Sequence, residues 1–182
     1  MLTSSRSSQS RGWPTLRPAL GLPVSLDVTQ QTLPSVDPAS PRLRVFQMYW
    51  RSLAPDGVLP AYSTFDVVRM PRELLPFLIL LDVLDGGRDF RYRVVGTGVV
   101  AAIGRDFTSE TVVEYRHRHE PPEVGEGYRR VCAARAPHLY EGTLESVGKE
   151  FIRYERLAVP LTGDDGKIAY ILACFQFDST SG

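Results

Sequence analysis

Metal or redox chemistry would depend on the three histidines and two cysteines of this 182-residue chain. His117 and His119 stand two residues apart among arginines and glutamates, a pattern typical of a solvated polar loop. His138 follows a proline at the start of an apolar run, so we expect it at the edge of a strand. Cys132 and Cys174 lack the CxxC spacing of a metal or redox pair and stand in apolar surroundings, which favours buried free thiols. The sequence therefore predicts no metal site.

Catalytic motifs are also missing, because the chain contains no GxSxG elbow, no HExxH pair and no phosphate-binding P-loop. Glu145, Glu150 and Glu155 lie on or beside predicted strands and could face a cavity. Such carboxylates more often pair with arginines across a sheet, here Arg153 or Arg156. We therefore expect a protein that is not an enzyme.

One glycine-rich segment invites a nucleotide-binding interpretation. Gly96 and Gly98 begin a GTG segment, but Ala101 replaces the third glycine of the GxGxxG pattern. The flanking strands also lack the parallel return strand of a dinucleotide-binding unit. The glycines are better explained as a corner between a strand and a helix.

Charge and hydropathy limit the possible partners. Lys plus Arg and Asp plus Glu both total 21, so no basic field would attract nucleic acid or an anionic membrane surface. No segment approaches the roughly 20 apolar residues that span a bilayer, and no compact secretory signal begins the chain. We expect a cytoplasmic protein with neither a nucleic-acid nor a membrane partner.

The elements that would position these residues begin with a hairpin. Two apolar runs, Phe77–Leu84 and Phe90–Val95, flank a turn at Gly86 and Gly87, which tolerate the positive φ angles of tight hairpins. A short helix over Gly98–Ile103 is expected to follow directly.

The remainder of the chain alternates from helix to sheet. A short helix is expected at 72–76, a polar loop or one further helical turn at 107–122, and a longer helix from Val124 towards Pro137. Apolar runs then predict three strands, at about 138–145, 151–161 and 167–177.

The amino-terminal part differs in composition. Residues 1–40 are rich in Ser and Pro and are expected to be a disordered tail, as are residues 179–182 at the other end. A helix is predicted over 41–54, with Ser40 as its N-cap, Pro41 at its first position, and Leu43, Phe46, Trp50 and Leu53 along one apolar stripe. The domain is expected to span 41–178.

The phrases LPFLILLDV, RDFRYRVVGTGVVAAIGRDFT and YERLAVPL followed by DDG resemble a family of single-domain PAS proteins common in alphaproteobacteria. The resemblance covers about Arg42 to Phe177. It implies an α+β PAS fold, with a five-stranded antiparallel sheet in the order 2-1-5-4-3 and short helices on one face around a pocket. It also implies a non-catalytic sensory or signalling module that binds a small molecule or a protein partner. A cone-shaped α+β enzyme resembling ketosteroid isomerase is the rival, but its helices would precede most of its strands.

The cofactors of PAS domains can be tested against the residues. Light-oxygen-voltage domains need a reactive cysteine within a GRNCRF-like phrase, and Phe107 occupies that position in the similar run Gly104-Arg105-Asp106-Phe107. Flavin-cysteinyl photochemistry is therefore not expected. Haem is also not expected, because the three histidines suit loop and edge positions better than an axial ligand. The identity of any cofactor stays open.

Strand alternation and helix spacing suggest what could line a pocket, although both faces of the predicted sheet are apolar and either could face the helices. We expect the helix at 41–54 to cover the second face. The pocket candidates are Tyr92, Val94, Ile103, Tyr128, Cys132, Tyr140, Tyr154, Arg156, Leu172 and Cys174.

Arg156 is the principal polar candidate, because a buried guanidinium must find an acceptor. It could bind an anionic ligand or pair with Glu141, Glu145 or Glu155.

A homodimer is expected through the N-terminal helix, as in many PAS proteins. The candidate interface residues are Phe46, Tyr49, Trp50 and Leu53. The alternative is that Trp50 packs in the core of its own chain.

Overall fold

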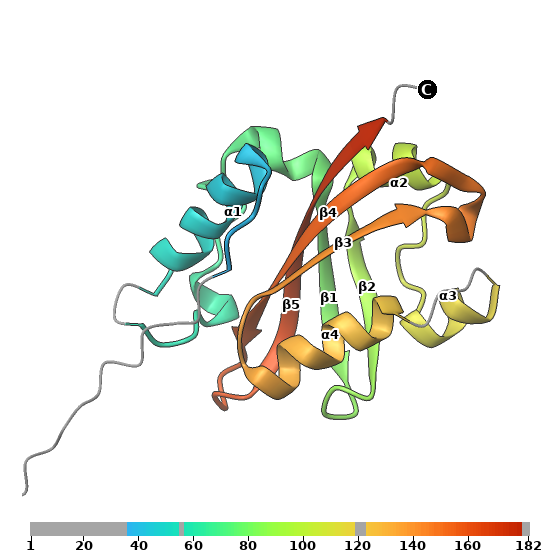
Figure 1. Ribbon diagram of the computed structural model, residues 1–182. Coiled ribbons are helices and arrows are strands. Elements are labelled where there is room, and N and C mark those ends of the chain that lie inside the picture. Colours follow the sequence, from blue (N-terminus) through green and yellow to red (C-terminus); the bar gives the residue numbers. More distant parts are fainter. Residues whose placement is uncertain (1–35, 55–56, 119–122, 180–182) are drawn as a thin grey trace, which may run out of the picture.

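A computed structural model describes residues 36–54, 57–118 and 123–179, and the side chains of 116–124 lie outside this description. Its centre is one antiparallel sheet in the order β2-β1-β5-β4-β3 (Figure 1). The predicted strand order is therefore confirmed. The strands are β1 (Leu78–Leu84), β2 (Asp89–Val95), β3 (His138–Leu144), β4 (Lys149–Thr162) and β5 (Ile168–Ser179).

Helices lie on both faces of this sheet, with α1 on one side and α2, α3 and α4 on the other (Figure 1). The helices are α1 (Pro41–Ser52), α2 (Thr97–Ile103), α3 (Val112–Arg118) and α4 (Glu123–Ala134), with 3-10 turns η1 (Tyr62–Thr64), η2 (Arg72–Phe77) and η3 (Glu145–Val147). No helix among the described residues is long and apolar enough to cross a bilayer.

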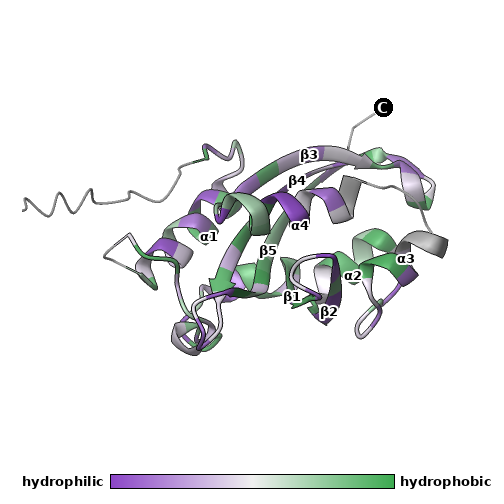
Figure 2. Ribbon diagram, turned by 90° about the horizontal axis from the view of Figure 1, so that it is seen from below, coloured by the Kyte–Doolittle hydropathy of each residue, from purple (hydrophilic) through white to green (hydrophobic). Residues whose placement is uncertain are grey.

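Each face of the sheet forms an apolar core with the helices that cover it. On β5, Ile171, Ala173 and Phe175 face the core beneath α2, α3 and α4, whereas Leu172 and Cys174 face the core beneath α1. Hydrophobic colouring gathers on the central strands, and the covering helices also carry hydrophilic residues (Figure 2). The sheet is therefore buried on both faces, as its apolar sequence predicts.

Helix α1 packs on the sheet of its own chain. Leu43, Phe46 and Trp50 are completely buried, and the indole Nε1 of Trp50 donates a hydrogen bond to the Pro160 carbonyl at 3.0 Å. Tyr49 instead donates its hydroxyl to the Asp66 carbonyl at 2.8 Å. Phe46 and Trp50 are therefore wrong as dimer anchors, because their whole surface is already used within one chain.

A carboxylate from the sheet caps the start of α1. Glu155 accepts hydrogen bonds from the backbone N–H groups of Ala39 at 2.8 Å and Ser40 at 2.9 Å. Ser40 occupies the predicted N-cap position, but its side chain makes no capping bond. Gln47 also donates to the Val36 carbonyl at 2.8 Å. Residues 36–40 are thus bound to the domain, which corrects the predicted end of the tail; residues 1–35 lie outside the described part.

Part of the segment between β2 and α4 forms the helix α3, one of the two alternatives predicted for 107–122. Residues 109–111 pair with the outer edge of β2, because the N–H of Tyr92 donates to the Glu110 carbonyl at 2.9 Å. Thr111 and Glu114 then form a reciprocal capping box, with bonds of 3.1 and 2.8 Å. This cap starts α3 and places Tyr115 over the sheet.

The GTG corner is a close-packing site. A side chain at Gly96 would collide with the Pro76 carbonyl, and one at Gly98 would lie 2.7 Å from the Phe77 ring. Both glycines therefore allow α2 to approach η2, which explains them without a nucleotide.

Candidate ligand cavity

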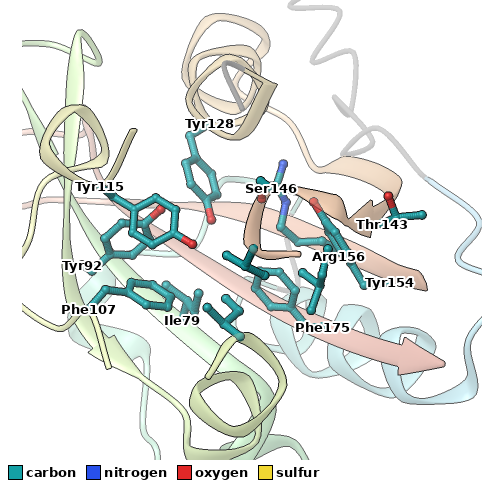
Figure 3. A pocket seen from close by; sticks show the side chains of 13 residues that line it. Ile79, Tyr92, Phe107, Tyr115, Tyr128, Thr143, Ser146, Tyr154, Arg156 and Phe175 are labelled. Atoms are coloured by element: carbon teal, nitrogen blue, oxygen red, sulfur yellow. The ribbon is translucent and has the colours of Figure 1, made fainter. Parts of the chain in front are cut away.

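A small cavity lies between the sheet and the covering segments α2, α3, α4 and η3. Its volume is about 50 Å³. Its walls are mainly aromatic and aliphatic, and Arg156 is the one cation among the described lining residues (Figure 3). The thirteen lining residues are Ile79, Tyr92, Ile103, Phe107, Tyr115, Tyr128, Thr143, Leu144, Ser146, Val147, Tyr154, Arg156 and Phe175.

Three aromatic rings form a rigid wall at the β2 side. Tyr92 meets Phe107 edge to face at 4.6 Å between centroids, and Tyr115 lies 5.1 Å from Phe107 and 6.0 Å from Tyr92. Such geometries are favourable beyond the area that they bury. Burial raises the pKa of Tyr92 well above its ordinary value and raises that of Tyr115 as well. Both phenols therefore stay neutral at physiological pH.

Arg156 supplies the charge at the opposite wall. It is only 1% exposed, yet its Nε and Nη2 atoms make no hydrogen bond among the described residues. Its guanidinium carbon lies 4.6 Å from the Tyr128 ring centroid and 5.3 Å from that of Tyr140, so two π faces partly compensate the charge. In Figure 3 the side chain extends between Tyr128 and Tyr154. Burial raises the pKa of Tyr128, and the nearby guanidinium opposes that rise.

Gly127 on α4 makes room for this guanidinium. An added Cβ at this position would collide with Nη2 of Arg156 and lie 3.5 Å from Cε1 of His138. The Nδ1 atom of His138 is also buried without a partner. Burial, followed by repulsion from Arg156, lowers the pKa of His138. Helix α4, the Arg156 guanidinium and the His138 imidazole therefore lie close together at Gly127.

The predicted ion pair of Arg156 is wrong. Glu155 points to the opposite face of the sheet, where it caps α1, and Glu141 and Glu145 are exposed at the surface. None of these three carboxylates forms a salt bridge with Arg156. The cause is alternation along β4, which sends neighbouring residues to opposite faces.

Five of the ten predicted pocket residues line the cavity, namely Tyr92, Ile103, Tyr128, Tyr154 and Arg156. Cys132 and Tyr140 pack against the same core without lining the cavity.

Three pocket predictions are wrong. Leu172 and Cys174 face α1 on the other side of the sheet. Val94 is 49% exposed, because the register shifts between the pairs Leu80 with Val94 and Leu81 with Tyr92. The shift leaves one extra residue on β2, a bulge that reverses its alternation.

Several lining residues were not predicted. Phe175 follows from the alternation of β5 once the cavity face is known, and Tyr115 follows from the Thr111–Glu114 capping box, a signal present in the sequence. The polar Thr143 and Ser146 lie where β3 ends and η3 begins, and no local pattern marks them.

The remaining titratable groups do not form a metal site. No cluster of three or more His, Cys, Asp or Glu residues occurs in the part of the chain that the structure describes. Burial raises the pKa of Cys132 to about 11 and that of Cys174 to about 12, so both thiols stay protonated. His138 starts the edge strand β3, as predicted; His119 and the side chain of His117 lie outside the described residues.

The position of the light-oxygen-voltage cysteine is filled by a structural aromatic. Phe107 is buried against Tyr92, and Arg105 forms a two-pronged ion pair with Glu110 at 2.9 and 2.6 Å. The segment Gly104-Arg105-Asp106-Phe107 thus shapes the cavity wall.

This sheet order, with helices inserted between β2 and β3 and a cavity beneath them, defines a PAS-type sensory fold. A family model described as PAS domain matches residues 39–176, and the chain belongs to this family, whose members are typically sensory or signalling modules. No curated protein matches.

Two solved structures are similar to this chain at 12% identity and a TM-score of 0.46. One is a sensory box sensor histidine kinase from Vibrio cholerae, with 59% of this chain and 85% of that chain covered. The other is a light-oxygen-voltage domain studied with a flavin analogue, with 63% and 86% covered.

Proposed function

We propose that this PAS domain is a non-catalytic sensory module that holds a small molecule in the cavity beneath α2, α3 and α4. The observation that carries the proposal is the cavity itself, which is bounded by aromatic rings on one side and a buried cation on the other. Ligand sites are typically concave and apolar, with a few convergent polar groups. The protein acts in the cytoplasm, where the free thiols of Cys132 and Cys174 stay reduced.

Occupancy would alter the helices above the sheet. Tyr115 on α3 and Tyr128 on α4 both line the cavity, so a ligand touches two covering helices at once. A change in the packing of these helices is the signal that a partner, or a second copy of the chain, would detect.

Native mass spectrometry of the freshly purified full-length protein tests this function. We expect a fraction of subunits to retain extra mass, and Ile103→Phe, which fills the cavity, should remove it. Val113→Phe on the exposed face of α3 is the matched control and should keep the extra mass. Bare subunits in every preparation would instead support a protein-interaction adaptor, a second function favoured by the small volume and dense aromatic packing of the cavity.

A further inference from the structure

The unpartnered atoms of Arg156 form one edge of its guanidinium. Nε and Nη2 present two parallel N–H donors on the side of the group away from Nη1, and these are the two nitrogens without partners. This edge matches the two oxygens of a carboxylate, which accept from it as a pair. The geometry of the orphan donors therefore specifies a planar, two-oxygen acceptor.

Among the described residues, none beside Arg156 supplies such a two-oxygen acceptor. Tyr140 from β3 and Tyr128 from α4 offer ring faces, the Tyr128 hydroxyl offers one oxygen to the guanidinium, and His138 offers an imidazole. The nearest carboxylate along β4, Glu155, is engaged by the amides of Ala39 and Ser40 on the other face. A guanidinium is always charged, so burying it without an anion is unfavourable.

The rest of the cavity limits the ligand to one negative charge. Arg156 is the single cationic residue among the described side chains that line the cavity, and Ile79, Phe107 and Phe175 provide apolar contacts around it. A dianion such as phosphate would bring a second charge into this low-dielectric space without a partner. The ligand therefore combines one anionic group with an apolar remainder.

The volume of the cavity limits the size of the ligand. A water needs roughly 10 to 15 Å³ of cavity volume, and this cavity offers about 50 Å³. At that ratio a molecule of about three to five non-hydrogen atoms fills this space, which is the size range from formate to propionate.

From these observations we infer that the cavity binds a short-chain organic monocarboxylate, whose oxygens accept hydrogen bonds from Nε and Nη2 of Arg156. The apolar chain of the acid lies against the rings of Phe107 and Phe175. This inference rests on the proposed sensory function and gives its ligand a chemical class.

Calorimetric titration of the full-length protein, unfolded and refolded to remove retained molecules, tests the inference. The probes are sodium propionate, the neutral isostere propionamide and sodium phosphate, all at matched ionic strength. We expect propionate to bind at least tenfold more tightly than either of the others. Arg156→Met should weaken propionate binding at least tenfold. Arg156→Lys, which keeps the positive charge but loses the two parallel N–H donors, should weaken it less.

Arg153→Met is the matched control, because Arg153 is an exposed arginine on the same strand, and it should bind propionate as the wild type does. Equal binding of propionamide, or propionate binding retained by Arg156→Met, would overturn the inference and leave the sensory cavity standing. Equal binding of phosphate would overturn the carboxylate assignment. If no probe binds but native mass spectra show a retained molecule, the inference fails and the proposed function survives. If no probe binds and the native mass spectra also show no retained molecule, both are refuted.

Discussion

Replacing Arg156 with methionine is expected to stabilise the ligand-free protein, although Arg156 is among its largest fully buried side chains. The reason is the pair of orphan donors, Nε and Nη2. Each buried donor without an acceptor destabilises a fold by about 1 to 3 kcal/mol, so the two together contribute about 2 to 6 kcal/mol. Methionine keeps an unbranched apolar stem and removes both donors.

The substitution also removes favourable contacts. The cation–π contacts with Tyr128 and Tyr140 stabilise by about 0.5 to 2 kcal/mol each. A small void beyond the shorter side chain costs about 1 kcal/mol more. With the middle of each range, the balance is a gain of about 0.5 kcal/mol, or about 1 to 2 °C in melting temperature for a domain of this size.

Urea unfolding of refolded, ligand-free protein measures this change, with the fluorescence of the buried Trp50 as the signal. Arg153→Met should alter the free energy of unfolding by less than about 0.5 kcal/mol, because Arg153 is exposed. A loss of more than about 2 kcal/mol in Arg156→Met would refute the reasoning, since it would mean that the guanidinium has a protein partner.

Four further changes test individual contacts. Gly127→Ala should destabilise the fold by about 1 to 2 kcal/mol, although alanine gains about 1 kcal/mol in helix propensity, because the new Cβ would collide with Arg156. The same loss in an Arg156→Met background would contradict the collision as the cause. Trp50→Ala should lower the free energy of unfolding by about 3 to 5 kcal/mol without changing the sedimentation coefficient. Dissociation of a dimer on this substitution would instead place Trp50 in an interface. Glu155→Gln should cost about 1 to 2 kcal/mol, because charge-assisted bonds to the α1 amides become neutral; unchanged urea midpoints would show that the cap is dispensable. Burial lowers the pKa of His138 in the folded state, so the unfolded chain binds the proton more readily. The free energy of unfolding should therefore fall as the pH drops below about 6.5. His138→Gln should flatten this dependence between pH 7 and 5.5, and an unchanged slope would exclude His138 as its source.

Most of the fold follows from local patterns. Alternating apolar runs located all five strands, and Gly86 and Gly87 adopt the positive φ values, 67° and 95°, that the predicted hairpin turn requires. The helix beginning at Pro41 is also confirmed, but it ends at Ser52. Helix η2 is a 3-10 turn, since Pro76 within it cannot donate an α-helical hydrogen bond.

The candidate site could be predicted only in part, because its decisive features are nonlocal. The bulge that turns Val94 outward depends on the register between β1 and β2, which alternation along β2 cannot reveal. The choice of cavity face, which excluded Leu172, depends on where α1 docks. The pairing of Glu155 with the amides of Ala39 and Ser40 joins residues 116 and 115 positions apart, so the sequence could not indicate this partner, although alternation along β4 already separates Glu155 from Arg156.

The most direct measurement of the central claim is a proton–nitrogen NMR spectrum of the arginine Nε–H groups, recorded with and without propionate. Arg156→Met assigns the Arg156 signal by its disappearance. We expect a slowly exchanging Nε–H resonance that shifts downfield on addition of propionate and stays in place with propionamide, because a carboxylate oxygen then accepts its hydrogen bond. An Arg156 resonance that does not respond to propionate would contradict the claim that this cavity is an anion-binding sensory site.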